Sequence, residues 1–154
     1  MTTACNAQKL TMKTELTVEQ SVTINASKEK IFDALINPEK IKQYMFGTEA
    51  KSDWKTGSPI SFNGEYQGHK YQDKGIVMTN EPSKLFQYKY WSSMSGMEDE
   101  ISNYATVTFT IDAVNDENKL TVKQVGFSGE IAKEHSVTGW TMILNHIKEI
   151  LEKE

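Results

Sequence analysis

The chain has 154 residues, 38% of them hydrophobic and 25% charged, which is the size and composition of one globular domain. Its 17 basic residues are all lysines against 21 acidic ones, and a net charge of −4 without any arginine argues against nucleic-acid binding. No apolar run approaches the roughly 18 residues of a membrane span, so we expect no stable membrane insertion.

The first residues show no hydrophobic periodicity. We expect residues 1–12 to be a disordered leader and residues 13–154 to form a single domain, although Met12 is also a candidate translation start. The leader lacks the apolar core of a signal peptide. Cys5 is the single cysteine and cannot form an internal disulfide, which is typical of a reducing compartment. These features favour a cytoplasmic protein.

Apolar and polar residues alternate from Leu16 to Ile24, which predicts a half-buried strand. Gln20 interrupts its apolar set, either as a strand-end or bulge residue or as an amide that faces a ligand. Ser27 then caps a short amphipathic helix, and Asn37-Pro38 begins a second short helix. We expect both helices to lie across the sheet.

Turn residues separate the strands that follow. We expect strands near 48–54 (a weak one), 60–66, 70–79, 85–91, 105–111 and 120–127. In the last strand the apolar phase shifts, which predicts a β-bulge near Lys123 or Gln124. Residues 92–103 form the longest irregular stretch, of a length that is often functional or mobile.

The last quarter of the chain, from about Gly129 to Glu154, has the periodicity of a long amphipathic helix. Its apolar stripe is formed by Val137, Trp140, Leu144, Ile147 and Leu151, with Ile143 and Ile150 beside it. Sequential strands with short turns imply an antiparallel sheet, and such a sheet needs an apolar partner for its inner face. The fold class is therefore α+β, with a curved sheet of six or seven strands around this helix.

Short pieces of sequence in this order resemble the helix-grip fold of the SRPBCC superfamily, which includes START domains and the birch-pollen allergen. More narrowly, they resemble the family named after the homologue of the activator of the heat-shock-protein-90 ATPase. The pieces are Ala26-Ser27-x-Glu29-x-Ile31-Phe32-x-Ala34-Leu35, Asn37-Pro38-Glu39, Gly64-Glu65-Tyr66-x-Gly68, Asp73-Lys74-Gly75-x-Val77, Glu81-Pro82-x-x-Leu85 and Glu134-His135-Ser136 with Gly139-Trp140. The resemblance implies an apolar ligand cavity between sheet and helix and supplies no catalytic motif.

Aromatic residues gather on strands expected to face the helix, as in a small-molecule pocket. Tyrosines are the better candidates for contacting a ligand because a buried phenol needs a hydrogen-bond partner, whereas rings such as Phe86 and Phe109 fill a core. Glycine inside the helix leaves room for a ligand or for a close strand, and Met94 and Met97 either close over a ligand or lie in solvent. The candidate cavity residues are Gln20, Phe46, Trp54, Phe62, Tyr66, Tyr88, Tyr90, Gly139, Trp140, Ile143 and Leu144.

Catalysis has little support in the sequence. His135 and His146 lie roughly 16 Å apart along one helix, so they cannot share a metal ion, and we expect neither metal nor cofactor. Glu65, His69 and Asp73 flank a tight turn, where they either solvate a hairpin or form an acid–base group.

Three functions are consistent with these patterns. The first is non-catalytic binding of a small hydrophobic or amphipathic molecule, by a monomer or homodimer. The second is an interaction module with a chaperone partner, and the third is a cyclase or hydrolase.

Overall fold

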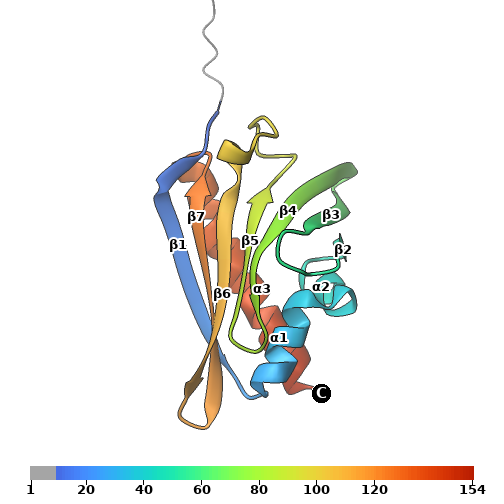
Figure 1. Cartoon of the computed structure of the whole chain (residues 1–154), viewed down its shortest axis with the longest axis vertical. Helices are drawn as coiled ribbons and strands as arrows, with labels where there is room; N and C mark the ends of the chain where they lie inside the picture. Colours follow the sequence, from blue (N-terminus) through green and yellow to red (C-terminus); the bar gives the residue numbers. More distant parts are fainter. Residues whose placement is uncertain (1–9) are drawn as a thin grey trace, which may run out of the picture.

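Seven β-strands form one antiparallel sheet that curves around a long carboxy-terminal helix in the computed structural model, which describes residues 10–154 (Figure 1). The strands are β1 (Lys13–Ile24), β2 (Glu49–Lys51), β3 (Pro59–Tyr66), β4 (His69–Glu81), β5 (Leu85–Trp91), β6 (Ala105–Val114) and β7 (Glu117–Phe127). The helices are α1 (Lys28–Ile36), α2 (Pro38–Tyr44) and α3 (Glu130–Glu152), with one 3₁₀ turn, Ile101–Asn103. The predicted α+β helix-grip fold is confirmed.

The strands lie in the order β1-β7-β6-β5-β4-β3-β2. Strands β2 to β7 pair with their neighbours in sequence, whereas β1 pairs with β7, the last strand of the chain. The first strand therefore lies beside the strand that leads into α3. No helix within residues 10–154 is long and apolar enough to cross a membrane.

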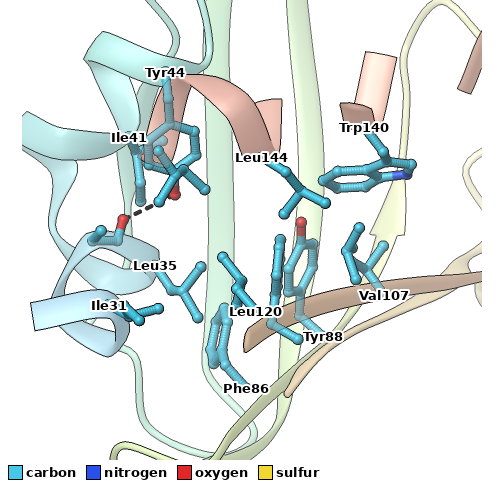
Figure 2. Packing of buried hydrophobic residues seen from close by; sticks show 14 of the residues in the cluster. Ile31, Leu35, Ile41, Tyr44, Phe86, Tyr88, Val107, Leu120, Trp140 and Leu144 are labelled. Carbon is cyan, nitrogen blue, oxygen red and sulfur yellow. Dashed lines mark hydrogen bonds between the residues drawn. The ribbon is translucent and has the colours of Figure 1, made fainter. Parts of the chain in front are cut away.

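The two short helices begin at the capping residues that the sequence predicts. The Ser27 hydroxyl accepts the Lys30 N–H at 3.2 Å, and the Asn37 side chain accepts the Glu39 N–H at 3.0 Å. The Tyr44 hydroxyl, at the end of α2, donates to the Ala34 carbonyl of α1 at 2.9 Å. This bond joins the two helices where they cover the sheet (Figure 2).

The centre of the sheet–helix interface is filled by side chains (Figure 2). Ring centroids lie 5.4 Å apart for Phe86 and Tyr88, 6.5 Å for Tyr88 and Phe109, and 5.7 Å for Phe109 and Trp140. From α3 the buried residues are Trp140, Leu144, Ile147 and Leu151. Val137 is 39% exposed, so the buried stripe of the helix begins one turn later than its apolar spacing predicts.

Two local predictions need correction, one in part and one entirely. The weak strand expected at 48–54 is only Glu49–Lys51, because the backbone turns away before Trp54, which has a φ of +63°. The bulge expected near Lys123 or Gln124 does not form: β6 and β7 pair without a register shift from Glu117 to Val125. The alternation of inward and outward side chains along β7 changes instead at Gly126, which has a φ of +104°. Phe127, the next residue, is therefore buried.

Candidate functional site

Two hollows adjoin at Tyr90 and Met94, and the first of them lies where β5 and β7 end and α3 begins. The first hollow has a volume of about 470 Å³ and lies under the loop of residues 92–103. Its lining is Met12, Tyr90, Ser92, Met94, Ser95, Met97, Ala105, Gln124, Gly126, Phe127, Ser128, Ala132, His135 and Ser136. A volume of this size is within the usual range for a ligand site.

The α3 wall of the first hollow carries an unsatisfied hydroxyl. The Ser136 Oγ is buried and has no hydrogen-bond partner within residues 10–154. One turn further along the same helix, the Trp140 indole N–H donates to Gln124 Oε1 at 3.0 Å, and the Gln124 amide nitrogen donates to the Gly126 carbonyl at 3.1 Å. These bonds fix the Gln124 amide on the inner face of β7, opposite Val107 of β6.

The loop above the first hollow is held by the start of the described chain. The Met12 N–H donates to the buried Asn103 side chain at 3.1 Å, and Leu10 makes a parallel bridge with Met97. Gly126 makes room for Met12, because a Cβ at this position would lie 2.5 Å from the Met12 sulfur. Of the predicted leader, residues 1–9, including Cys5, lie outside the described residues, while Leu10 and Met12 contact this loop.

The second hollow, of about 300 Å³, lies between the end of α2, the β3–β4 hairpin and α3. Its lining is Met45, Phe46, Thr48, Glu65, Tyr66, Tyr71, Asp73, Tyr90, Met94 and Ile143. Tyr90 and Met94 also line the first hollow, so the two spaces adjoin at these side chains.

Asp73 is a buried carboxylate on the inner face of β4, opposite Phe62, with 8% of its surface exposed. One oxygen accepts the Tyr90 hydroxyl at 2.5 Å, and the other accepts the Ser93 N–H at 2.9 Å and the Ser93 hydroxyl at 3.1 Å. Burial, and then the nearby Asp73 charge, raise the pKa of Tyr90 well above its ordinary value. The phenol therefore remains a proton donor to this carboxylate at neutral pH.

The side chain of Tyr71 lies over Gly64, which is its direct partner on β3. A Cβ at position 64 would collide with the Tyr71 hydroxyl and ring, so the glycine is what lets the ring lie there. The Tyr71 and Thr48 hydroxyls share a hydrogen bond of 2.6 Å. This bond ties the segment after α2 to the sheet beside the second hollow.

Of the residues that the sequence singles out, four belong to the packed centre: Phe62, Tyr88, Trp140 and Leu144 are all buried. Tyr88 is a special case, because its hydroxyl points toward α3 in Figure 2 and no hydrogen-bond partner is found for it within residues 10–154. Burial raises the pKa of Tyr88. Its phenol is therefore protonated and faces the sheet–helix interface.

Four other candidates, Tyr90, Phe46, Tyr66 and Ile143, line the second hollow, where Phe46 and Tyr66 are 58% and 61% exposed. The remaining three lie elsewhere. Gln20 is half-buried on β1 and lines neither hollow, and Trp54 packs edge-on against Phe86. Gly139 faces open space rather than a close strand.

The suggested acid–base group does not assemble around either hollow. Glu65 and Asp73 line the second hollow, but His69 lines neither and is exposed. Within residues 10–154, no three His, Cys, Asp or Glu side chains are grouped so that they could hold a metal ion.

Sequence reasoning missed Ser136, Gln124, Thr48 and Tyr71, which line the hollows. One signal was available for Ser136: it lies four residues before Trp140, which places a small polar residue on the buried face of the helix. Gln124 was obscured by the apparent phase shift in its strand.

Comparison with known proteins agrees with this architecture. A profile of the family described as "Activator of Hsp90 ATPase homolog 1-like protein" matches residues 25–152. No curated protein matches the chain. A protein of Cytophaga hutchinsonii with a known solution structure is 37% identical, with a TM-score of 0.77 over 92% of this chain and 97% of that one.

Two more distant structures share the fold. A Chromobacterium violaceum protein is 19% identical, with a TM-score of 0.74 over 90% of this chain and 98% of its own. The Aha1 dimer of Colwellia psychrerythraea is 20% identical, with a TM-score of 0.71 over 88% of this chain and 96% of its own.

Proposed function

Because the chain belongs to the family of Activator of Hsp90 ATPase homolog 1-like proteins, we propose that it uses the helix-grip fold to bind a small amphipathic molecule without transforming it. The ligand enters the first hollow and lies between the sheet and the first half of α3. The observation that carries this proposal is the buried Ser136 hydroxyl, which has no partner within residues 10–154 and lies on the wall of that hollow.

A buried hydroxyl without a hydrogen bond costs roughly 1–3 kcal/mol. A polar group of a ligand beside Ser136 would recover this free energy on binding. The proposal therefore favours a ligand with a polar group and an apolar body over a pure hydrocarbon.

The apolar body of the ligand would contact Met97, Phe127 and Ala132, which line the first hollow. Methionine side chains are flexible and adapt to ligands of different shape. Met94, 59% exposed in the loop above, lies where a ligand would enter. These contacts support a site that is selective for size and polarity more than for exact shape.

Thermal-shift and calorimetric titrations with an alkane, the matching fatty alcohol and the matching fatty acid test this proposal on the full chain. At about a hundred times its Kd, a ligand that binds only the folded state stabilises it by about 2.7 kcal/mol. Ala132→Phe, which fills the hollow, should abolish the shift. Ser136→Ala should weaken alcohol binding about threefold to tenfold, in line with one lost hydrogen bond.

Thr141→Ala is the matched control, because this hydroxyl lies on the same helix and donates to the Val137 carbonyl, outside the hollow. It should leave binding unchanged. Saturable binding that is unaffected by Ala132→Phe, or the absence of binding for every member of the series, would overturn the proposal.

A protein partner is the second candidate function. It is favoured by the exposed side chains of Phe46, Tyr66 and Met94 around the second hollow, together with the family's description as Hsp90 ATPase activator homologues. The test is whether the protein changes the ATPase rate of a purified Hsp90, and whether Phe46→Ala removes the effect. An unchanged rate at saturating protein would exclude this activity.

The same proposal includes a cytoplasmic location and a monomeric or homodimeric state. The Colwellia psychrerythraea relative is described as a dimer. Cell fractionation and light scattering of the purified chain test these two points separately.

A further inference from the structure

The binding of an amphipathic molecule in the first hollow does not account for the residues that line the second hollow. It is lined by four aromatic rings and two carboxylates: Phe46, Tyr66, Tyr71, Tyr90, Asp73 and Glu65. None of its lining residues is basic. Aromatic faces carry partial negative charge, so rings and carboxylates together make a site of one electrostatic sign.

Asp73 supplies the buried negative charge of this site. Its hydrogen bonds come from Tyr90 and Ser93, which are neutral donors, and it forms no ion pair within residues 10–154. Neutral donors stabilise a buried carboxylate but leave its charge uncompensated, and buried charges are ordinarily paired.

Two aromatic rings at the mouth of the second hollow are exposed, and one of them is carried by a strained backbone. Phe46 has a φ of +54°, a left-handed conformation that is an outlier for a bulky residue, and its ring is 58% exposed. Tyr66 is 61% exposed at the end of β3. Strained backbone and exposed aromatic rings concentrate at binding sites. Phe46 also contacts the His146 ring, at 5.4 Å between centroids.

We propose that the second hollow binds an organic cation, a quaternary or alkylated ammonium group, against the faces of these rings with Asp73 as its counter-charge. A volume of about 300 Å³ accommodates a trimethylammonium head. The inference concerns a different hollow from the proposed amphipathic site and does not depend on that site being occupied.

The test uses the full chain and follows backbone amide shifts by NMR at about pH 8. The probes are tetramethylammonium, choline and the uncharged carbon analogue of choline, in which a tert-butyl group replaces trimethylammonium. Choline and its analogue have the same shape, so they differ only in charge. We expect saturable shifts around the second hollow with both cations, and binding of the neutral analogue at least about tenfold weaker.

Variants separate the contribution of the rings from that of the carboxylate. Phe46→Leu and Tyr66→Leu keep apolar bulk at exposed positions while removing the ring face, and each should weaken choline binding about twofold to fivefold. Ile131→Ala, at an exposed apolar position outside the hollow, should have no effect. Asp73→Asn should weaken binding by more than about tenfold, and the two leucine variants decide the matter if this variant does not fold.

Equal binding of choline and its neutral analogue would overturn the proposal, as would unchanged binding in both leucine variants or the absence of saturable shifts with either cation. Binding of the fatty alcohol to the first hollow is measured in the same samples. Failure of one site is therefore distinguishable from failure of the other.

Discussion

The Ser136 hydroxyl of α3 is buried beside the first hollow and has no hydrogen-bond partner within residues 10–154, which costs the ligand-free protein stability. Ser136→Ala should raise the free energy of unfolding by about 1 kcal/mol beyond the small gain in helix propensity. Urea denaturation of the ligand-free protein measures this, with Thr141→Ala as the control for propensity. A loss of stability in Ser136→Ala would mean that the hydroxyl has a partner.

Gly64 and Tyr71 are coupled across two strands, because a Cβ on the glycine would occupy the position of the ring. Gly64→Ala should destabilise the protein by about 1–3 kcal/mol, as overpacking does. In a Tyr71→Ala background the same change should be neutral or stabilising by about 0.5–1 kcal/mol, since alanine restricts the unfolded chain.

A double-mutant cycle in urea measures this coupling. Additive effects of the two substitutions would show that Tyr71 does not depend on Gly64 for its position. The hydrogen bond between Tyr71 and Thr48 would then have to be maintained by other contacts.

Asp73 shows where residue-level prediction reaches its limit. It is in phase with Tyr71, Gly75 and Val77 on β4, so strand alternation alone places it on the inner face. A lone aspartate near a hairpin is nevertheless expected in solvent, because charged residues are rarely buried. Its burial depends on donors from Tyr90 and Ser93, which lie 17 and 20 residues away in sequence.

At the scale of the element, α3 tests how far periodicity determines burial. Its spacing predicts Val137 and Leu144 on one apolar face, but Val137 is 39% exposed and Leu144 is 1% exposed. Leu144→Ala should therefore cost about 2–5 kcal/mol, whereas Val137→Ala should change stability by less than about 0.5 kcal/mol. Chemical denaturation of both variants gives the comparison, and similar losses would contradict the structure.

The strands and helices were largely predictable because alternation, capping residues and turn residues act locally. Ser27 and Asn37 cap the helices that they were expected to cap, and the β3–β4 turn lies at Gln67-Gly68. The hollows were not predictable. The first hollow depends on the register between β6 and β7, on the left-handed Gly126 and on the contact of Met12 with the loop, none of which a local pattern encodes.

At the scale of the whole molecule, the carboxy-terminal end of α3 fastens the sheet and the short helices together. Glu152 accepts the Asn25 N–H at 2.8 Å, just after β1, and also pairs with Lys148 at 2.8 Å. Lys148 in turn donates to the Thr23 carbonyl at 2.7 Å, and Lys40 of α2 forms an ion pair with Glu154. These contacts join segments more than a hundred residues apart in sequence.

This junction makes stability dependent on pH in a defined direction. The Asn25 N–H, and then Lys148, lower the pKa of Glu152 below its ordinary value of 4.5. A carboxyl whose pKa is lower in the folded protein contributes stability above its unfolded pKa and loses that contribution as the pH falls through the folded pKa. Glu152→Gln should therefore be less stable than the parent at about pH 7, and the difference should vanish near pH 3.

Urea denaturation at a series of pH values measures the difference between the two proteins. Asp53 and Asp99, whose pKa values are also lowered, titrate in both proteins and cancel in the comparison. At high salt, the share of this stability difference that comes from Lys148 should become smaller, while the share that comes from the Asn25 N–H should remain. Salt screens an exposed ion pair more than it weakens a hydrogen bond to the backbone. A difference that persists unchanged at low pH would show that Glu152 stabilises the junction by packing rather than by its charge.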